Sequence, residues 1–213
     1  MSLLAKRELR SSVRAILHSL DEQSLAYQSE RVCEKVLQHP KFAEASIVSV
    51  YLSMKGRELD TTCLIKWILR TKKENTDKNK RLFIPLILPA TYSTERRSFM
   101  RMVELKSEED WLSLRENSWG IKEPSLDDLD SRTSLENILA SGSDNCLMLV
   151  PGVAFGLDGS RLGHGRGYYD RYLRDNCSHS ENFYSIGLAL HEQIVEDIPM
   201  NANDVILNEV IVT

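Results

Sequence analysis

The chain has 213 residues, of which 42% are hydrophobic and 27% are charged, and its formal net charge is -4 at pH 7. This composition is typical of a globular protein and excludes a disordered or fibrous chain. The small negative charge gives no overall basic field, so we expect neither a nucleic-acid nor a membrane partner. A chain of this length usually forms one domain, and we predict a single domain over residues 1–213.

Four cysteines are spread along the chain and form no C-x-x-C pair. They are Cys33, Cys63, Cys146 and Cys177. This spacing indicates neither a zinc site nor a disulfide framework, so we expect thiols in a reducing compartment. No apolar run reaches the length of about 18 residues that a membrane span needs, and the N-terminus lacks the pattern of a secretory signal. We predict a cytoplasmic protein, with the mitochondrion as the alternative because residues 1–20 are rich in basic side chains, as transit peptides are.

Hydrophobic periodicity predicts helices and strands that alternate along the chain. We expect two helices in residues 1–39 with Asp21 as a cap and Pro40 as a stop, then a strand at 46–52, a helix at 61–70 and a solvated loop at 72–80. Strands at 82–88 and 99–105 follow, and then a polar surface connection at 125–144 with one helical turn at 135–139. The last third is expected to form a strand at 146–150, a helix at 168–176 and strands at 183–190 and 205–212. This order predicts a three-layer, Rossmann-like α/β fold, in which a mainly parallel sheet has helices on both faces.

The segment from Pro151 to Asp170 is the most informative part of the sequence. It follows a buried strand and ends at the start of a helix, where unpaired backbone N–H groups favour an anion. A simple chain reversal needs one or two glycines, whereas here Gly163, Gly165 and Gly167 alternate with polar residues. Their spacing fits neither the dinucleotide-binding motif nor the P-loop. The segment therefore predicts a ligand-binding loop that belongs to neither of these motifs.

Residues 161–170 read R-L-G-H-G-R-G-Y-Y-D, and this stretch resembles the signature of the 5-formyltetrahydrofolate cyclo-ligases, also called methenyltetrahydrofolate synthetases. The likeness extends to residues 6–10, 51–54, 58–61, 119–124, 186–193 and 203–204. It implies an enzyme that uses Mg-ATP to convert 5-formyltetrahydrofolate to 5,10-methenyltetrahydrofolate, with release of ADP and phosphate. In the reaction of that family, phosphorylation activates the formyl oxygen before the N-10 amine attacks.

The resemblance also implies an ATP site made by two segments. Lys6 and Arg10 lie one helical turn apart, and Arg14 follows one turn later without an assigned role. A row of this kind is more often a solvated helix face. The implied ATP contacts are Lys6, Arg7, Glu8, Leu9, Arg10, Arg161, Leu162, Gly163, His164, Gly165, Arg166, Gly167, Tyr168 and Tyr169. Arg166 is the catalytic candidate because a guanidinium can stabilise charge on the transferred phosphoryl group.

The folate and the metal are assigned in the same way. The implied folate contacts are Leu52, Glu58, His164, Gly165, Arg166, Gly167 and Tyr168. Glu58 would accept hydrogen bonds from the pterin, and Trp119 could stack on the flat substrate, although a loop acid and a core aromatic are the ordinary alternatives. Asp170 and Asp204 are the implied Mg²⁺ ligands because carboxylates are hard oxygen donors. An Asp in a first helical turn is also stabilised by the helix dipole alone.

Three positions depart from the family's pattern. Gly156 stands where many members have Asp, Asn208 replaces an acid in the last strand, and His164 takes a position often held by Arg. Two other functions compete with the cyclo-ligase: a non-catalytic folate or nucleotide binder, and a sugar-phosphate isomerase or transferase on a similar sheet. Dependence of the activity on a nucleotide distinguishes the cyclo-ligase from these two functions. Nothing in the sequence requires a dimer, so we expect a monomer.

Overall fold

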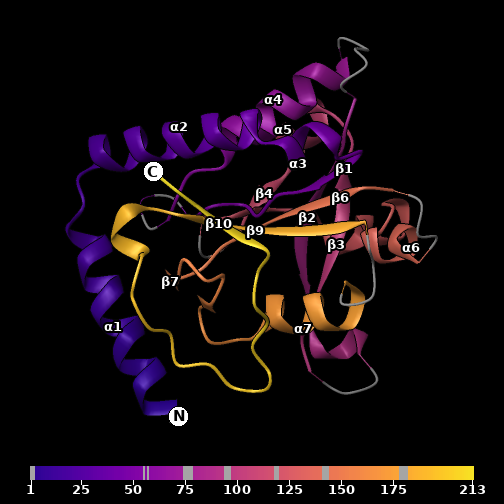
Figure 1. The fold of residues 1–213 in the computed structure, drawn as a ribbon. Helices are drawn as coiled ribbons and strands as arrows, with labels where there is room; N and C mark the ends of the chain where they lie inside the picture. Colours follow the sequence, from indigo (N-terminus) through magenta and orange to yellow (C-terminus); the bar gives the residue numbers. More distant parts are fainter. Residues whose placement is uncertain are drawn as a thin grey trace.

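A six-stranded sheet lies at the centre of the computed structural model (Figure 1). The structure describes residues 3–54, 56, 58–73, 79–93, 97–117, 120–140, 144–177 and 182–213. The strand order is β10-β9-β6-β1-β2-β3, and among these strands the β2–β3 pair is antiparallel while the others are parallel. The strands are β1 (Ile47–Ser49), β2 (Arg81–Leu88), β3 (Phe99–Leu105), β6 (Cys146–Val150), β9 (Phe183–Ala189) and β10 (Glu209–Val212). The predicted, mainly parallel sheet is confirmed.

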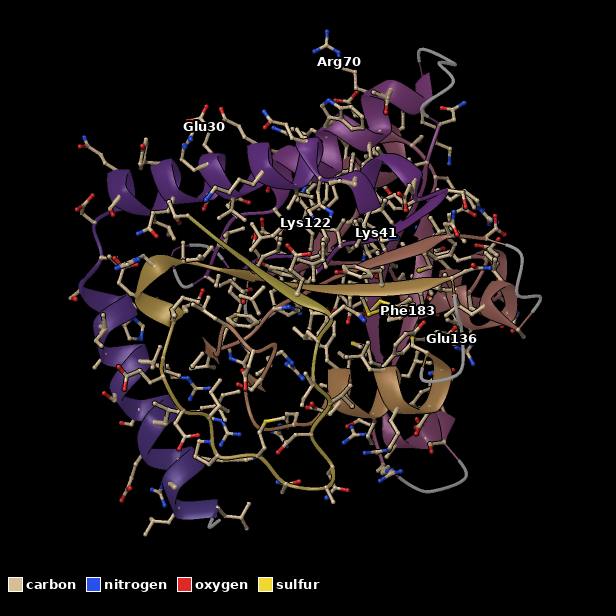
Figure 2. All side chains as sticks on the ribbon, in the orientation of Figure 1. Glu30, Lys41, Arg70, Lys122, Glu136 and Phe183 are labelled. Carbon is tan, nitrogen blue, oxygen red and sulfur yellow. A yellow bond between two sulfur atoms is a disulfide. The ribbon has the colours of Figure 1, made fainter. Side chains whose placement is uncertain are left out.

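Helices cover both faces of this sheet (Figure 1). One face carries α1 (Leu3–Ser19), α2 (Glu22–Gln38), α3 (Pro40–Glu44) and α4 (Thr62–Lys73), and the other carries α6 (Leu135–Leu139) and α7 (Tyr168–Asn176). Side chains alternate between the two cores along β2, with Leu82 and Ile84 on one side and Phe83 on the other. Polar residues such as Glu30 on α2 and Arg70 on α4 point away from the sheet (Figure 2). The three-layer α/β prediction is therefore confirmed.

The two N-terminal helices form as the sequence predicts. The Asp21 side chain caps α2 and accepts a hydrogen bond of 2.7 Å from the backbone N–H of Ser24. Pro40 ends α2, but it also begins α3, where its missing N–H costs nothing in the first helical turn. The expectation that Pro40 only stops a helix was therefore incomplete, because Phe42 on α3 is buried in the core.

Several other elements differ from the prediction. β1 and β10 are shorter than the runs 46–52 and 205–212, while α6 and α7 have the predicted bounds. The unpredicted elements are α5 (Glu108–Ser113), β4 (Arg115–Glu116), β5 (Lys122–Glu123), β7 (Ala154–Phe155), β8 (Arg161–Leu162), η1 (Ala90–Tyr92), η2 (Leu126–Ser131) and η3 (His191–Gln193). Each of these spans six residues or fewer, so hydrophobic periodicity has too few positions to detect it.

The prediction of a solvated loop at residues 72–80 is wrong at both ends of this range. At its start, α4 continues to Lys73. At its end, Lys80 is 5% exposed, and its ammonium donates hydrogen bonds of 2.6 Å to the carbonyl oxygen of Ala45 and 3.2 Å to that of Ala43. A lysine at the C-terminal end of a helix satisfies carbonyl groups that lack helical partners. Residues 74–78 lie outside the described residues.

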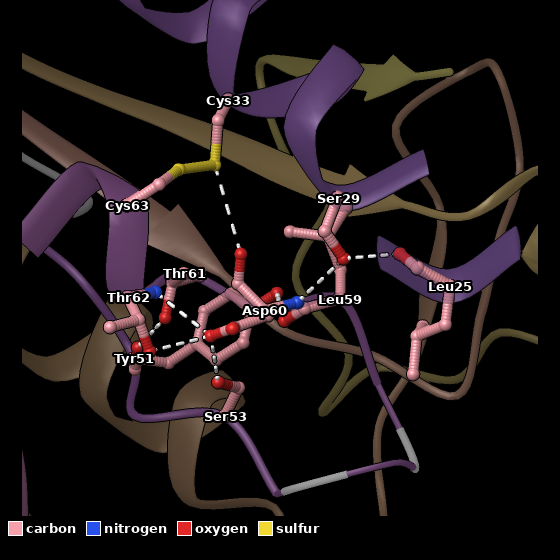
Figure 3. Close-up of a disulfide and its surroundings, with 10 residues drawn as sticks. All are labelled: Leu25, Ser29, Cys33, Tyr51, Ser53, Leu59, Asp60, Thr61, Thr62 and Cys63. Atoms are coloured by element: carbon pink, nitrogen blue, oxygen red, sulfur yellow. Dashed lines mark hydrogen bonds between the residues drawn. A yellow bond between two sulfur atoms is a disulfide. The ribbon is translucent and has the colours of Figure 1, made fainter. Parts of the chain in front are cut away.

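Cys33 on α2 and Cys63 at the start of α4 form a disulfide (Figure 3). The expectation of free thiols is wrong for this pair and confirmed for Cys146 and Cys177, which are free and buried. The pair escaped detection because the two cysteines are separated by 30 positions, and spacing alone does not bring α2 beside α4. Cys33 Sγ also lies 3.7 Å from the carbonyl oxygen of Asp60. The bond thus ties α2 to the start of α4, directly after the segment that holds Glu58.

Replacing Cys63 by serine is expected to lower the free energy of unfolding of the oxidised protein by about 3 kcal/mol, because the bond restricts a 30-residue separation in the unfolded chain. Cys63 is exposed, so serine leaves no cavity behind. Urea unfolding followed by circular dichroism measures the difference. Wild-type protein in excess dithiothreitol is the matched control and should unfold at the same urea concentration as the variant. Equal stability of the variant and the oxidised wild type would contradict the prediction.

Candidate active site

The glycine-rich segment lies beyond the carboxyl end of β6, where the sequence places it. It first forms the antiparallel hairpin of β7 and β8, and residues 163–167 then lead into α7. Gly167 is the N-cap of α7 and has a φ of 65°, a left-handed conformation that a side chain opposes. The loop and the first turn of α7 therefore sit at the edge where parallel sheets bind ligands, with backbone N–H groups suited to an anion.

A buried ion pair closes this loop at its base. Arg161 Nη2 lies 2.9 Å from Asp170 Oδ2, and the arginine is 4% exposed. Its Nη1 donates a hydrogen bond of 3.1 Å to the carbonyl oxygen of Pro151, and its guanidinium lies 5.8 Å from the ring centre of Tyr169. Arg161 and Asp170 are the first and last residues of the signature. The pair therefore fixes both ends of the loop relative to each other, and the role of Arg161 in nucleotide binding stays a prediction.

Two cations on α1 reach the glycine loop and its neighbours. The Lys6 ammonium, which is 7% exposed, pairs with the Asp204 carboxylate. Arg10 Nε donates a hydrogen bond of 2.8 Å to the carbonyl oxygen of Gly163. The other predicted ATP contacts of this helix differ: Arg7 and Glu8 are exposed, and Leu9 packs against the core. Helix α1 therefore forms one wall of the site through the face that carries Lys6 and Arg10.

The two predicted metal ligands lie close to each other. Asp170 Oδ1 accepts a hydrogen bond of 3.3 Å from the backbone N–H of Val205, the residue after Asp204. Both carboxylates are near enough to Arg10 to raise its pKa, although burial has the larger effect and lowers that pKa. Among the described residues there is no group of three or more carboxylate, imidazole or thiolate side chains that could hold a metal. Mg²⁺ commonly binds through one or two carboxylates, with water and phosphate oxygens completing its shell, so the pair fits this ion.

Glu58, from the segment between β1 and α4, reaches the glycine loop at His164. It is 6% exposed, and its Oε1 accepts a hydrogen bond of 2.6 Å from the backbone N–H of Met54. Its Oε2 lies 3.7 Å from His164 Nε2. Burial raises the pKa of the hydroxyl groups of Tyr51 and Tyr169, and the charge of Glu58 raises both further. A carboxylate with one oxygen held in place and free lone pairs remaining can accept hydrogen bonds from a ligand.

The tip of the loop is exposed and positively charged. The Arg166 guanidinium makes no hydrogen bond or ion pair with another described residue, while the carbonyl oxygen of Arg166 accepts a hydrogen bond of 2.9 Å from Arg171 Nη1. Arg14 Nη2 lies 3.5 Å from His164 Nδ1, which brings this residue of undecided role into the site. The spacing of Arg14 from Arg10 was the sequence signal that could have placed Arg14 in the site. No sequence signal pointed to Arg171, because its contact with Arg166 depends on how α7 leaves the loop.

Some predicted contacts lie beneath the site surface. Leu52 and Leu162 are both buried in the core, so their side chains support the residues that face the loop. Tyr169 is also packed against the core, and its hydroxyl has no hydrogen-bond partner among the described residues. Trp119, predicted to stack on the substrate, lies outside the described residues.

The structure accounts for two departures from the family's pattern. A Cβ at Gly156 would lie 2.3 Å from Ser160 Oγ and 2.5 Å from Asp158 Oδ1, because the Asp158 side chain accepts hydrogen bonds from Ser160 in this turn. Asn208 Oδ1 accepts a hydrogen bond of 2.8 Å from the backbone N–H of Ser185, near the amino end of β9. Asn208 therefore joins two strands and contacts neither predicted metal ligand.

Known proteins share this arrangement of chain and loop. The model of the 5-formyltetrahydrofolate cyclo-ligase family matches residues 3–213. The chain belongs to this family. The 5-formyltetrahydrofolate cyclo-ligase of Mus musculus is 34% identical over 208 residues, covering 97% of this chain and 93% of the mouse protein. A probable 5-formyltetrahydrofolate cyclo-ligase of Caenorhabditis elegans is 35% identical over 208 residues, or 97% of this chain and 91% of the worm protein.

A solved structure from the same family also matches the fold. The NMR structure of the 5,10-methenyltetrahydrofolate synthetase of Aquifex aeolicus superimposes with a TM-score of 0.70 and is 28% identical in sequence. The match covers 97% of this chain and 89% of the Aquifex chain. The family membership inferred from the loop signature is therefore confirmed over the whole chain.

Replacing Arg161 by methionine is expected to lower the free energy of unfolding by about 3 kcal/mol, because Asp170 would keep a partly buried charge without its partner. Arg166→Met is the matched control from the same loop, and its exposed side chain predicts a change within about 0.5 kcal/mol. Urea unfolding monitored by tryptophan fluorescence compares the two variants. Similar destabilisation by both would show that the ion pair does not hold the loop.

Proposed function

We propose that the protein catalyses the ATP-dependent cyclisation of 5-formyltetrahydrofolate to 5,10-methenyltetrahydrofolate, with release of ADP and phosphate. One observation carries the proposal in a chain of this family. At Gly163 the glycine loop meets Arg10 of α1, the helix whose Lys6 pairs with Asp204, and these groups suit a magnesium nucleotide. At His164 the same loop meets the buried carboxylate of Glu58, which suits a pterin. The loop therefore adjoins both groups that the reaction must bring together.

The nucleotide is assigned to the side of the loop that faces α1. Lys6 and Arg10 supply positive charge for the phosphates, and the backbone N–H groups of residues 163–167 supply donors. Asp170 and Asp204 are proposed to hold Mg²⁺, which would neutralise charge on the phosphate oxygens. Asp204 pairs with Lys6 in the structure, so an ammonium and a carboxylate lie side by side at the proposed nucleotide position.

The folate is assigned to the side that faces Glu58. The fixed carboxylate accepts hydrogen bonds from the N–H donors of the pterin, and His164 lies beside it at the loop tip. In the proposed reaction the formyl oxygen attacks the γ-phosphoryl group, and ADP leaves. The N-10 amine then attacks the activated formyl carbon, and phosphate leaves as the ring closes. Positioning and charge stabilisation supply most of the catalysis in such a transfer.

Arg166 is proposed to stabilise the phosphoryl group during transfer. Its guanidinium is exposed at the loop tip and has no partner among the described residues, so it is available for a ligand. Its backbone is held by Arg171, which donates to the Arg166 carbonyl oxygen. A cation on a fixed backbone stabilises developing negative charge at little reorganisation cost.

The compartment and assembly belong to the proposal as well. No helix in the described segments combines the length and the apolar character needed to cross a bilayer. We propose a cytoplasmic monomer that binds small molecules and no nucleic acid. Lys6, Val13 and Leu17 on α1 are buried, so residues 3–19 form an integral part of the fold, which does not suit a removable transit peptide over that stretch.

An absorbance assay tests the reaction directly. Purified protein with 5-formyltetrahydrofolate and Mg-ATP is expected to produce the near-ultraviolet absorbance of the methenyl product. Omission of ATP and addition of EDTA are the two controls, and each should abolish the rise because the formyl oxygen would remain unactivated. Folate binding without any ATP-dependent rise in absorbance would contradict the proposal and favour a non-catalytic folate binder.

Replacing Arg166 by alanine is expected to lower kcat by about a hundredfold, because one preorganised cation at the transferred group is lost. Arg31→Ala changes an exposed arginine on α2 that pairs with Glu34 and has no assigned role in the site, and it should retain wild-type turnover. The same absorbance assay measures both variants, and circular dichroism shows whether each is folded. Near-normal turnover by a folded Arg166→Ala protein would remove Arg166 from the catalytic role.

A further inference from the structure

The Cys33–Cys63 disulfide contrasts with the compartment proposed above. Structural disulfides are rare in a reducing cytoplasm, and the disulfides that do form there usually change their redox state as part of their role. Cys33 lies on α2 and Cys63 in the first turn of α4, 30 positions later in the sequence (Figure 3). The bond therefore needs an explanation other than permanent cross-linking of a secreted protein.

The two cysteines of the bond differ in accessibility. Cys63 is exposed, whereas Cys33 is only 3% exposed. Thiol–disulfide exchange begins when a thiolate attacks one sulfur atom of a disulfide, and access decides which sulfur atom is attacked. A thiol from solvent is therefore expected to attack Cys63 Sγ, with Cys33 Sγ as the leaving group.

The reduced pair also has a place in the fold. Cys33 Sγ lies 3.7 Å from the carbonyl oxygen of Asp60, so a thiol formed there can donate a weak hydrogen bond to that oxygen. The thiol of Cys63 would face water, because this residue is exposed. Leu64 and Ile68 of α4 are fully buried, and they keep the helix packed on the core without the bond. The fold therefore accommodates both redox states.

Cys146 and Cys177 are unsuited to the same exchange. They are 2% and 6% exposed. Burial raises the pKa of the Cys146 thiol to about 12, and it also raises the pKa of the Cys177 thiol. The thiolate is the reactive form of cysteine, so these two buried thiols are expected to stay inert. Exchange with thiols in solution is thereby confined to the Cys33–Cys63 pair.

Asp60 links the disulfide to the proposed folate site. Its backbone N–H donates a hydrogen bond of 3.0 Å to Ser29 Oγ on α2 (Figure 3). Its Oδ1 accepts hydrogen bonds of 2.9 Å from the backbone N–H of Thr62 and 3.1 Å from Ser53 Oγ, which hold the start of α4 to the segment after β1. Glu58 is two residues before Asp60, so a shift of α4 relative to α2 is expected to move Glu58 as well.

Helix α2 is a firm anchor for this segment. Gln28 Nε2 donates a hydrogen bond of 3.0 Å to Glu192 Oε2. Gln28 Oε1 accepts hydrogen bonds of 2.8 Å from the backbone N–H of His191 and 3.0 Å from Thr213 Oγ1. These contacts hold α2 to η3 and to Thr213. A covalent bond from α2 to the start of α4 therefore ties the neighbourhood of Glu58 to a part of the fold that is itself held in place.

We propose that the Cys33–Cys63 pair is a reversible redox site, which exchanges with a small-molecule thiol such as glutathione and thereby sets the affinity for folate. The inference rests on the proposed function, which supplies both the folate and the reducing compartment. The oxidised form restricts movement of the Glu58 segment before the ligand arrives, and a preorganised site loses less free energy when it binds. Reduction should therefore weaken folate binding.

The exchange consumes two thiols in two steps. The first thiolate bonds to Cys63 Sγ and forms a mixed disulfide, while the electron pair of the broken S–S bond goes to Cys33 Sγ, which takes a proton. The second thiolate attacks the small-molecule sulfur of that mixed disulfide, so Cys63 leaves and becomes a thiol. Two electrons and two protons thus pass to the protein, and the two small molecules leave as one disulfide. Glutathione disulfide reverses both steps.

Thiol counting tests the exchange by itself. Folded protein is equilibrated in buffers with different ratios of glutathione to glutathione disulfide, quenched with acid, unfolded and alkylated, and intact mass spectrometry counts the thiols. We expect two thiols in oxidising buffer and four in reducing buffer, with the same end points from either direction. A count that does not change with the ratio, whether it stays at two or at four, would overturn the inference.

Equilibrium binding of 5-formyltetrahydrofolate without ATP tests the effect on the folate site. The reduced wild type is expected to bind about fivefold more weakly than the oxidised wild type, because part of the preorganisation is lost. Cys63→Ser cannot form the bond, so it should bind like the reduced wild type in both buffers, and circular dichroism verifies that it is folded. Equal affinities of the oxidised and reduced wild type would contradict the coupling.

Steady-state kinetics provide a further readout. Reduction should raise KM for folate about fivefold and leave kcat unchanged, because Arg166 lies in the glycine loop and not in the Glu58 segment. A fall in kcat with unchanged KM would count against the inference. Failure of the proposed function has a different signature: neither redox form would bind folate or make the methenyl product, while the thiol count would still follow the glutathione ratio.

Discussion

The buried ion pair between Arg161 and Asp170 is the constraint on which the site depends. Charges removed from water are costly unless each has a close partner, so this pair leaves the loop little freedom at its base. The eight residues between them, 162–169, must then form a closed turn, and α7 must begin where it does. The start of α7 in turn sets the positions of Tyr168 and of Arg171, whose guanidinium lies 5.3 Å from the centre of the Tyr168 ring and donates to the carbonyl oxygen of Arg166.

Contacts between distant parts of the chain complete the site. Lys6 meets Asp204 across 198 positions of sequence, and Arg10 meets Gly163 across 153. Glu58 comes from a third segment, between β1 and α4, and the Cys33–Cys63 disulfide ties α2 to the start of α4, directly after that segment. No single element carries enough groups to bind both a nucleotide and a folate. The parallel sheet solves this by collecting the ends of its strands and their following loops at one edge.

Local sequence patterns predicted those features that local physics determines. Alternating apolar runs gave the layered sheet, and the glycine spacing gave the loop together with the first residue of α7. Burial of charge depends instead on tertiary packing, which periodicity does not report. For this reason the polar run predicts a solvated Lys80 although this residue caps α3, and the cysteine spacing predicts separate thiols although Cys33 and Cys63 are bonded. The signature likewise identified Arg161 and Asp170, but it did not indicate that they pair with each other.

The pairing of Lys6 with Asp204 also has a consequence for how the protein is made. Chains fold progressively as they leave the ribosome, and elements whose partners are still missing stay exposed. Helix α1 is synthesised before residue 204, so its buried ammonium is separated from its partner by 198 positions of chain. β1 likewise needs β6 on one side and β2 on the other. The Lys6 ammonium must therefore remain without this partner until residue 204 has been synthesised, and a product truncated before residue 204 would lack the counter-charge for Lys6.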